Sequence, residues 1–399
     1  MTAAKGSSSV DYGFDTEIDR SATFSSKWEK YAGRDILPYW VADMEFPTPY
    51  FVLDAVRARL EHPILGRWRT PPDFIESFQG WLQRAYGWAV PAEWLVWIPG
   101  VVTGFNLAAL AAARLADTAH KADPGTAILI PTPVYYPFLS VPRNTDQQAL
   151  SVPLVRDGAR WCMDFDAMQD ALDQWTGAPV RLLLLSNPQN PTGRAYTRAE
   201  LSLLADFCLR NNLVLCSDEI HSPIILDEQA RHIPVASLSQ TIAERTITLF
   251  AATKTYNMPG LSCGVAVIPE LALRRAFIHS MGGLVPGIGP LNFAASQAAF
   301  ADQSDYLQEL LAYLRGNHRR VQEVVGNRMT AVEATYLAWI DLSDTPVAGG
   351  PGAFFESHGL GLSDGAPFGG PGFVRFNFAC PRSMLERGLD RYQAAMSSL

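Results

Sequence analysis

Short apolar runs alternate with helical patterns through the middle of the chain. The runs cover residues 95–98, 127–130, 180–185, 213–216 and 246–250, and Pro99 and Pro131 end the first two. Residues 101–115 and a segment that begins at Thr197 have helical spacing, and Glu200 completes a capping box with Thr197. Continuously apolar strands between helices predict an α/β fold, with a mostly parallel central sheet and helices on both faces.

The two flanks of this region have other patterns. Residues 1–35 are polar with scattered aromatic side chains, which is typical of an arm that becomes ordered by packing elsewhere. On the N-terminal side we predict a strand over 38–44 and helices over 49–62 and around 74–82, with a loop over 62–72 between the helices. On the C-terminal side we predict a helix from 293 to about 326, strands over 334–340 and 373–378, and a helix from about 383. A loop over 348–372 is expected to cross near the cleft. We therefore expect three parts: an N-terminal arm over 1–45, a large domain over 46–290 and a small α+β domain over 291–399.

Composition excludes several classes of protein. The chain has 399 residues, is 48% hydrophobic and carries a net charge of −8, which argues against a nucleic-acid-binding surface. Its 5 cysteines are scattered without metal-ligand spacing, so we expect reduced thiols and no metal site. No apolar run approaches the roughly 20 residues that span a bilayer, and the start, MTAAKGSSSVDYG, lacks an apolar signal core. We expect a cytoplasmic protein without membrane or nucleic-acid partners.

Four polar features lie where predicted strands end, which is where parallel α/β sheets bind ligands. They are the turn 100–104 before a helix, the rigid segment 187–194, the segment 218–221 and Lys254. Each feature alone has an ordinary structural explanation: a plain turn, a helix cap or a solvated lysine. Together, these four features suit the cofactor pyridoxal 5′-phosphate (PLP). The lysine can form an imine with the aldehyde of PLP, and the carboxylate can hold the ring nitrogen. An amide can contact the ring oxygen, and the helix N-terminus can bind the phosphate.

Seven segments carry a more specific resemblance. They are WVADMEF at 40–46, HPI at 62–64, PVYYPF at 133–138, NPQNPTGR at 187–194, SDEIHS at 217–222, TKTYNMPGL at 253–261 and VRFNFACPR at 374–382. With them the chain resembles fold-type I PLP-dependent enzymes of the class I/II aminotransferase superfamily over about residues 35–395. Within that superfamily it is most similar to C–S lyases of the MalY/PatB cystathionine β-lyase type. The resemblance implies that the large domain binds PLP and that the protein is a homodimer with a shared active site.

The resemblance also implies roles for individual residues. Lys254 would be the Schiff-base lysine and the base that moves the Cα proton. Asp218 would pair with the pyridine nitrogen, Asn190 and His221 would lie near the ring hydroxyl, and Tyr135 would stack on the ring, with Tyr136 beside it near the substrate. The amides of Val101 and Val102 and the hydroxyl of Thr253 would bind the phosphate. Arg375, Asn190 and Ala42 would bind the substrate. A buried arginine such as Arg375 can grip a carboxylate through two parallel hydrogen bonds, which a lysine cannot imitate.

The sequence departs from these patterns at three positions, the first of which the C–S lyase group itself leads one to expect. Ser262 stands eight residues after the lysine, where many fold-type I enzymes have a phosphate-binding arginine. Arg67 occupies the place of a tyrosine that reaches the neighbouring subunit's phosphate, so we expect Arg67 to supply a cation across a dimer interface, with substrate binding as the competing role. Pro223 replaces an aspartate, which indicates a substrate preference other than that of a housekeeping cystathionine lyase.

The reaction implied by the resemblance is α,β-elimination from an L-cysteine S-conjugate or cystathionine, which yields a thiol, pyruvate and ammonia. An aminotransferase, or a decarboxylating or oxidatively deaminating PLP enzyme, would use the same residues, so the reaction class stays open. A PLP-binding regulator without turnover is a third hypothesis, disfavoured by the presence of Lys254, Asp218 and Arg375. The unusual Arg67-Trp68-Arg69 loop indicates a bulky conjugate.

Overall fold

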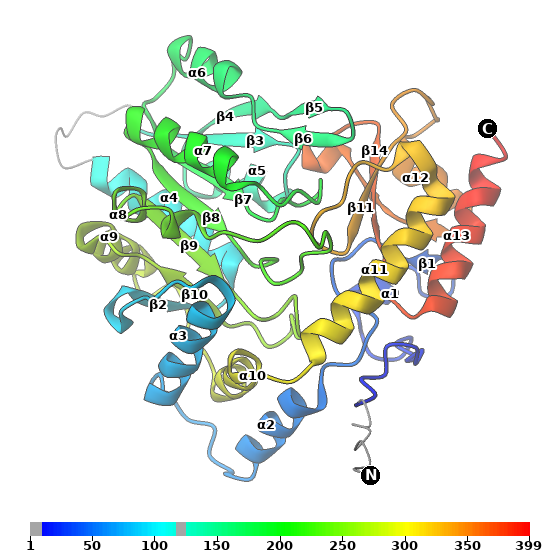
Figure 1. The fold of residues 1–399 in the computed structure, drawn as a ribbon, viewed down its shortest axis with the longest axis horizontal. Coiled ribbons are helices and arrows are strands. Elements are labelled where there is room, and N and C mark those ends of the chain that lie inside the picture. Colours follow the sequence, from blue (N-terminus) through cyan, green and yellow to red (C-terminus); the bar gives the residue numbers. More distant parts are fainter. Residues whose placement is uncertain (1–9, 117–124) are drawn as a thin grey trace, which may run out of the picture.

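The computed structural model describes residues 10–116 and 125–399 and is built around a seven-stranded sheet (Figure 1). The strands lie in the order β2 (Leu95–Ile98), β10 (Gly264–Val267), β9 (Thr246–Phe250), β8 (Val214–Asp218), β7 (Val180–Ser186), β3 (Ala127–Thr132) and β4 (Gln148–Pro153). All neighbours pair in parallel except β10, which is antiparallel to β2 and β9. The mostly parallel sheet predicted from the sequence is thereby confirmed. The residues outside the description include most of the start in which no signal core was found.

Helices cover both faces of this sheet, as its doubly apolar strands require. Ile128, Leu182 and Leu184 pack on one face, and Leu129 and Leu183 on the other. The first face is covered by α4 (Val101–Ala116), α5 (Pro137–Asn144) and α9 (Leu271–Met281), and the second by α6 (Phe165–Asp173), α7 (Arg198–Arg210) and α8 (Gln240–Ala243). The capping box predicted for Thr197 and Glu200 is present at the start of α7.

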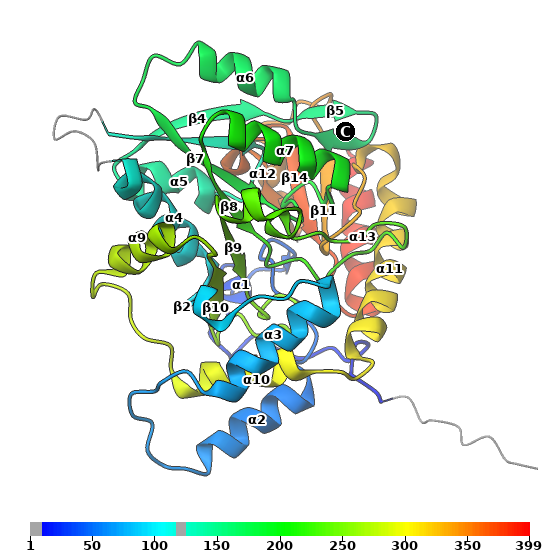
Figure 2. The same cartoon turned by 60° about the vertical axis from the view of Figure 1, so that its left-hand side comes forward.

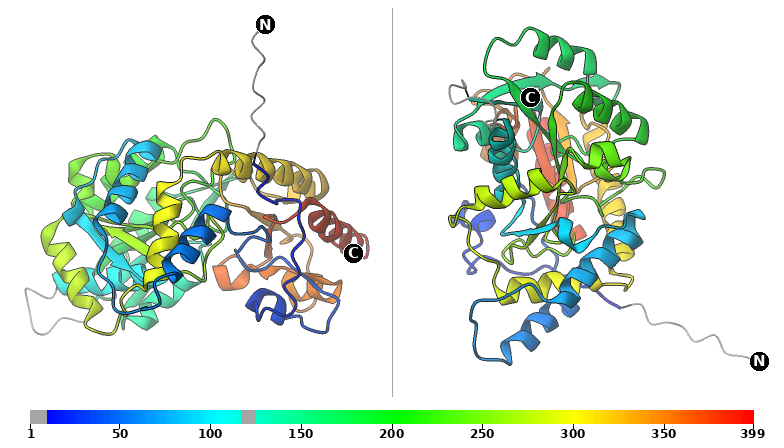
Figure 3. Two further views of the ribbon diagram at one scale, coloured as in Figure 1. Left: turned by 90° about the horizontal axis from the view of Figure 1, so that it is seen from below. Right: turned by 90° about the vertical axis from the view of Figure 1, so that its left-hand side faces the viewer.

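A second group of elements gathers on one side of the large sheet (Figure 3, left). It contains the sheet β11–β14–β13 (Leu337–Asp341, Phe373–Asn377, Ser363–Asp364), the pair β1–β12 (Leu37–Pro38, Leu360–Gly361), and the helices α1 (Ser26–Glu29), α11 (Tyr306–Val325), α12 (Pro351–Ser357) and α13 (Arg382–Met396). Three more helices, α2 (Tyr50–Leu60), α3 (Pro72–Tyr86) and α10 (Pro290–Ala301), lie together below the sheet (Figure 2). The hairpin β5–β6 (Val155–Asp157, Arg160–Cys162) and short 3₁₀ turns at Ala92–Trp94, Val235–Ser237, Gly326–Arg328 and Ala366–Phe368 complete the described elements.

Three predicted elements were wrong in extent. The single helix from 293 to about 326 is two helices, α10 and α11, because Asp302 leaves the helical conformation and its side chain accepts a hydrogen bond from the amide of Ser304. The strand β3 continues through Pro131 to Thr132 along β4, beyond the point where its pairing with β7 ends. The predicted loop over 348–372 contains α12, β12 and β13.

The strand predicted over 38–44 was also wrong beyond its first residue. Residues 40–46, which we call the wall segment, are irregular because side chains take up their backbone carbonyls. The amide of Asn377 donates to the carbonyls of Val41 and Asp43, each at 2.7 Å, and the amide of Asn257 donates to those of Met44 and Phe46. Strand pairing is therefore replaced by bonds to distant side chains.

Gly104 brings the first turn of α4 close to the sheet. A Cβ atom at this position would lie 2.6 Å from Cδ1 of Ile98 and 3.0 Å from both methyl groups of Leu249. Only glycine allows this approach, which fixes where the N-terminus of α4 points.

We expect Gly104→Ala to lower the free energy of unfolding by about 1–3 kcal/mol, because the added methyl group overpacks this contact. Urea denaturation followed by circular dichroism measures the change. Gly287→Ala is the matched control, since nothing lies within 4 Å of that added methyl group. Equal stability of the two variants would contradict the packing argument.

Candidate functional site

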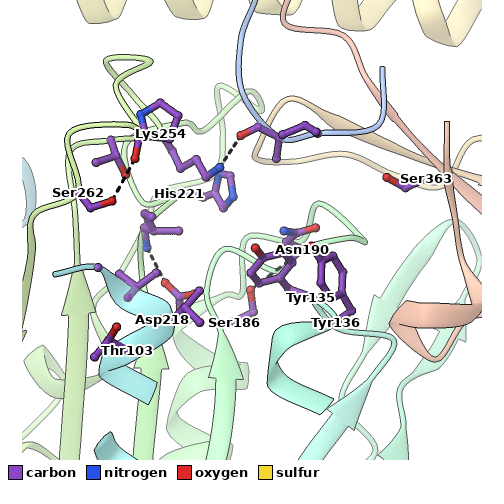
Figure 4. Close-up of a pocket in the computed structure, with 18 of the residues that line it drawn as sticks. Thr103, Tyr135, Tyr136, Ser186, Asn190, Asp218, His221, Lys254, Ser262 and Ser363 are labelled. Atoms are coloured by element: carbon purple, nitrogen blue, oxygen red, sulfur yellow. Dashed lines mark hydrogen bonds between the residues drawn. The ribbon is translucent and has the colours of Figure 1, made fainter. Parts of the chain in front are cut away.

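A cavity of about 290 Å³ opens at the carboxyl ends of β7, β8 and β9, between the large sheet and β14 (Figure 4). Eleven residues predicted for the site line it: Ala42, Val101, Val102, Tyr135, Tyr136, Asn190, Asp218, His221, Thr253, Lys254 and Arg375. They come from segments far apart in the sequence, which the parallel sheet brings to one edge. Arg67 does not line the cavity; it is exposed on the loop between α2 and α3.

Lys254 follows β9 and points into this cavity. Its Nζ atom donates to the carbonyl of Ala42, which also accepts a hydrogen bond of 3.0 Å from the hydroxyl of Tyr336. The pKa of Lys254 is lowered to about 8, mainly by burial and also by the nearby Arg375 guanidinium, while Asp43 and Asp218 oppose the shift. An amine with such a pKa is neutral in a useful fraction near pH 7, as a nucleophile or base requires.

Asp218 is the last residue of β8, and its side chain is buried. The amide of Ile220 donates to its Oδ1 atom at 3.1 Å. The pKa of Asp218 is raised to about 7, mainly by burial and also by the adjacent Glu219, while the hydrogen bond from Ile220 opposes the shift. A carboxylate held in this way has a strong tendency to find a cationic partner, and a protonated ring nitrogen would provide one.

Arg375 lies on β14 and is also buried. Its guanidinium donates to Oδ1 of Asn190 at 3.0 Å and to the carbonyl of Trp40 at 2.8 Å, while its Nε atom has no partner. Burial lowers the pKa of Arg375 to about 10, so the group stays charged at neutral pH. Among the described residues, neither Arg375 nor Lys254 forms an ion pair with a carboxylate, which leaves the buried Arg375 and the half-buried Lys254 available to an anionic ligand.

His221 faces the same space. Burial, reinforced by Lys254 and Arg375, holds its pKa well below the ordinary value, so the imidazole is neutral. Its Nδ1 atom is buried without a partner, and its ring lies 5.7 Å from that of Tyr336. A neutral imidazole with an unused nitrogen suits a hydrogen bond to a ligand.

The first turn of α4 closes the opposite end of the cavity with Gly100, Val101, Val102 and Thr103. The first amides of a helix have no partners within it, and they attract anions. Thr253 and Ser262 are the other residues at this end that carry hydroxyl groups. The cavity lining contains no lysine or arginine other than Lys254 and Arg375, so this end lacks a cation of its own.

Sequence reasoning gave no individual role to several lining residues, although some of them lie within segments that it singled out: Trp40, Val41, Pro99, Thr103, Ser186, Ile220, Pro259 and Ser363. Ser363 lies in the predicted loop over 348–372, and its hydroxyl donates to the carbonyl of Trp40 at 2.7 Å. A buried pair behind Asp218 was also missed: Nε2 of His232 lies 2.7 Å from Glu219, and no local motif relates the two residues. Among the described residues, no three His, Cys, Asp or Glu side chains group as a metal site, and no helix is long and apolar enough to cross a membrane.

Comparisons with known proteins agree with this geometry. The model of the family "Aminotransferase class I and II" matches residues 66–391. The chain is 32% identical to cystathionine beta-lyase PatB of Bacillus subtilis (strain 168), over 96% of this chain and 100% of that protein. Among solved structures, OvoB superposes with a TM-score of 0.90 at 39% identity, over 97% of this chain and 99% of that one. The PLP-bound C-S lyase from Staphylococcus hominis superposes with a TM-score of 0.87 at 29% identity, over 97% and 98%.

The raised pKa of Asp218 predicts a pH-dependent stability for the ligand-free protein. The folded state retains a proton that the unfolded state releases, so stability falls as pH rises between the ordinary pKa of 3.8 and about 7. Asp218→Asn removes this penalty. We expect the difference in the free energy of unfolding between Asp218→Asn and the unmodified protein to be more favourable to the variant at pH 8 than at pH 5, by roughly 2–3 kcal/mol.

Thermal melts of ligand-free protein at both pH values measure this gain. Asp206→Asn is the control, because Asp206 is exposed on α7 and its removal changes no buried charge. A gain for Asp218→Asn that is the same at pH 5 and pH 8 would show that the carboxyl group carries no buried charge.

Proposed function

Because this chain belongs to the class I and II aminotransferase family, we propose that it is a PLP-dependent carbon–sulfur β-lyase. It acts on an L-cysteine S-conjugate or cystathionine by α,β-elimination and releases a thiol, pyruvate and ammonia. The observation that carries the proposal is the pair of cations, the half-buried Lys254 and the buried Arg375, which share one cavity with Asp218 and have no carboxylate partner among the described residues. The names of the relatives, a cystathionine beta-lyase and a C-S lyase, support the reaction class.

The residues present fit PLP. The unpartnered Nδ1 of His221 and the buried carboxylate of Asp218 match a ring that carries a hydroxyl group and a protonated nitrogen. The cofactor would be held by Asp218 at the ring nitrogen, by Asn190 and His221 at the hydroxyl, by Tyr135 on the ring face and by Val101, Val102 and Thr253 at the phosphate. When bound, PLP supplies an electron sink for a carbanion at the substrate Cα.

The protein's own groups bind the substrate and move its proton. Arg375 takes the α-carboxylate, and Asn190, which already accepts from Arg375, lies beside it. Lys254 is held by the carbonyl of Ala42 and can accept the Cα proton at Nζ, since its lowered pKa leaves part of the amine neutral. The bond between Cβ and sulfur then breaks, and the thiolate leaves with the electron pair. Tyr136 lines the cavity and is 47% exposed, so its ring is available to contact a sulfur substituent.

Incubation with cystathionine and with S-alkyl cysteines tests the reaction class. Release of pyruvate together with free thiol supports a β-lyase. Amino transfer that depends on a keto acid, or carbon dioxide release, would overturn the proposal in favour of another PLP reaction. A series of S-substituents of increasing size tests the expected preference for bulky conjugates, and fastest turnover of the smallest member would refute that preference.

We expect Arg375→Lys to raise the KM for the amino-acid substrate about 10- to 100-fold, because an ammonium group cannot form the bidentate contact with the carboxylate. Steady-state kinetics of pyruvate release measure this effect. Arg328→Lys is the control: its guanidinium pairs with Asp344 at the surface, and we expect unchanged kinetics. A normal KM for Arg375→Lys would place the carboxylate elsewhere.

We further propose that a second copy of the chain completes the phosphate end of the site through Arg67. The loop between α2 and α3 projects from the molecule (Figure 1) and exposes Ile64, Leu65 and Trp68 by 68%, 52% and 41%. The guanidinium of Arg59 stacks at 4.5 Å on Trp68 and donates to the carbonyl of Ile64, which orders the loop. An exposed apolar loop that carries an arginine without an ion pair to any described residue suits an interface with a site that lacks a cation.

Arg67→Ala should weaken PLP binding about tenfold, as expected for the loss of one charge-assisted contact to a phosphate. Equilibrium dialysis followed by absorption spectroscopy measures retention of the cofactor. Arg57→Ala serves as control, because Arg57 is exposed on α2 and pairs with Asp54. Unchanged retention combined with a raised KM would instead assign Arg67 to substrate binding.

A further inference from the structure

Four charged side chains lie together outside the cavity, and two of them, Asp43 and Glu45, belong to the wall segment. Arg20 pairs with Asp43 at 3.2 Å and with Glu45 at 3.0 Å. Lys27 pairs with Glu45 at 2.7 Å and with Asp43 at 3.4 Å. We call these four residues the charge cluster; its two positive and two negative groups cancel.

Stability alone is a poor explanation for this cluster. The side chain of Lys27 is 2% exposed and that of Glu45 is 4% exposed, so both ions have lost nearly all of their hydration. Such a buried pair often contributes less to stability than apolar residues of the same size. Buried charges of this kind are frequently retained because they specify one arrangement of neighbouring groups, and here their neighbour is the wall segment.

The wall segment connects the charge cluster to the reactive lysine. Lys27 donates to the carbonyl of Asp43 at 3.1 Å, and Asn377 donates to the carbonyls on both sides of Ala42. The carbonyl of Ala42 between them receives the hydrogen bond from Lys254. A shift of Asp43 would therefore displace the group that orients Nζ of Lys254.

We propose that the charge cluster is a positioning device for Lys254: it holds the Ala42 carbonyl in place, and through Lys27 it opposes the effect of the Asp43 carboxylate on the reactive amine. Arg20, Lys27, Asp43 and Glu45 are thus positioning residues, and none of them lines the cavity. The inference rests on the proposed function, because it assigns Lys254 the role of the cofactor-binding amine.

The charges around Lys254 agree in sign with this role. Asp43 raises the pKa of Lys254 more than Asp218 does, and Lys27 lowers it. The other charged or titratable groups that face the same space are Arg375 from β14, His221 and Asp218 from the end of β8, and the hydroxyls of Tyr135, Tyr136 and Tyr336. Without Lys27, the carboxylate of Asp43 would favour a protonated nitrogen on Lys254, which cannot act as a base.

A double-mutant cycle tests the proposal through opposite shifts. The readout is the pH titration of the visible absorption of the lysine-bound cofactor in the loaded protein, which reports protonation of the Lys254 nitrogen independently of turnover. We expect Lys27→Met to raise the midpoint by about half to one pH unit and Asp43→Asn to lower it by a similar amount. The double variant, with its charges again balanced, should return to within about 0.2 units of the unmodified protein.

Arg34→Met is the control, since Arg34 is an exposed residue of the same N-terminal region that pairs with Glu356, and we expect no shift. If the charge cluster serves only to stabilise the fold, the two single variants should shift the midpoint in the same direction, or the double variant should shift it at least as far as either single variant. Either result overturns the proposal. If Lys27→Met does not fold, Asp43→Asn and the double variant decide the question by the same criteria. An unmodified protein that shows no visible band with PLP would instead refute the proposed function.

Discussion

The structure depends on keeping three charged groups out of water at one place. Asp218 and Arg375 are buried in the same cavity, Lys254 is half-buried there, and desolvation shifts the pKa of each toward its neutral form. Desolvation of an ion costs several kcal/mol, and the mutual attraction of these groups is incomplete because neither cation pairs with a carboxylate there. The site is therefore destabilised until a ligand with complementary charges occupies it, which is the usual relation between an active site and the stability of its scaffold.

The scaffold makes such a site possible by packing on both faces of the sheet. Each central strand places alternate side chains into two separate apolar cores, so the strands cannot shift by one residue without exposing one set to water. The last residues of β7, β8 and β9 are thereby held in register at one edge. Gly104 sets the approach of α4 to the same edge, and the free amides of that helix face the cavity opposite Arg375.

The other side of the site is made from irregular backbone. The wall segment forms no strand, and its carbonyls are held by Asn257, Asn377 and Arg375. Carbonyl groups that are not committed to a sheet can accept from a reactive amine, as that of Ala42 does from Lys254. The charge cluster supports this segment from behind, which links the N-terminal residues to the chemistry although they do not line the cavity.

The sequence by itself determined the mostly parallel sheet and eleven of the residues that line the cavity. The sheet follows from local signals: apolar runs of strand length with prolines and glycines at their ends. Polar groups directly after those runs indicated the site, and the resemblance of seven segments to a known family implied the roles of its individual residues. Only the tertiary structure decided the course of residues 40–46, the break between α10 and α11, and the surroundings of Lys27, which sequence analysis did not single out. Those features depend on partners far away in the chain, such as Asn377 for Asp43 and Glu45 for Lys27, and no periodicity or spacing in a single sequence encodes such long-range pairing.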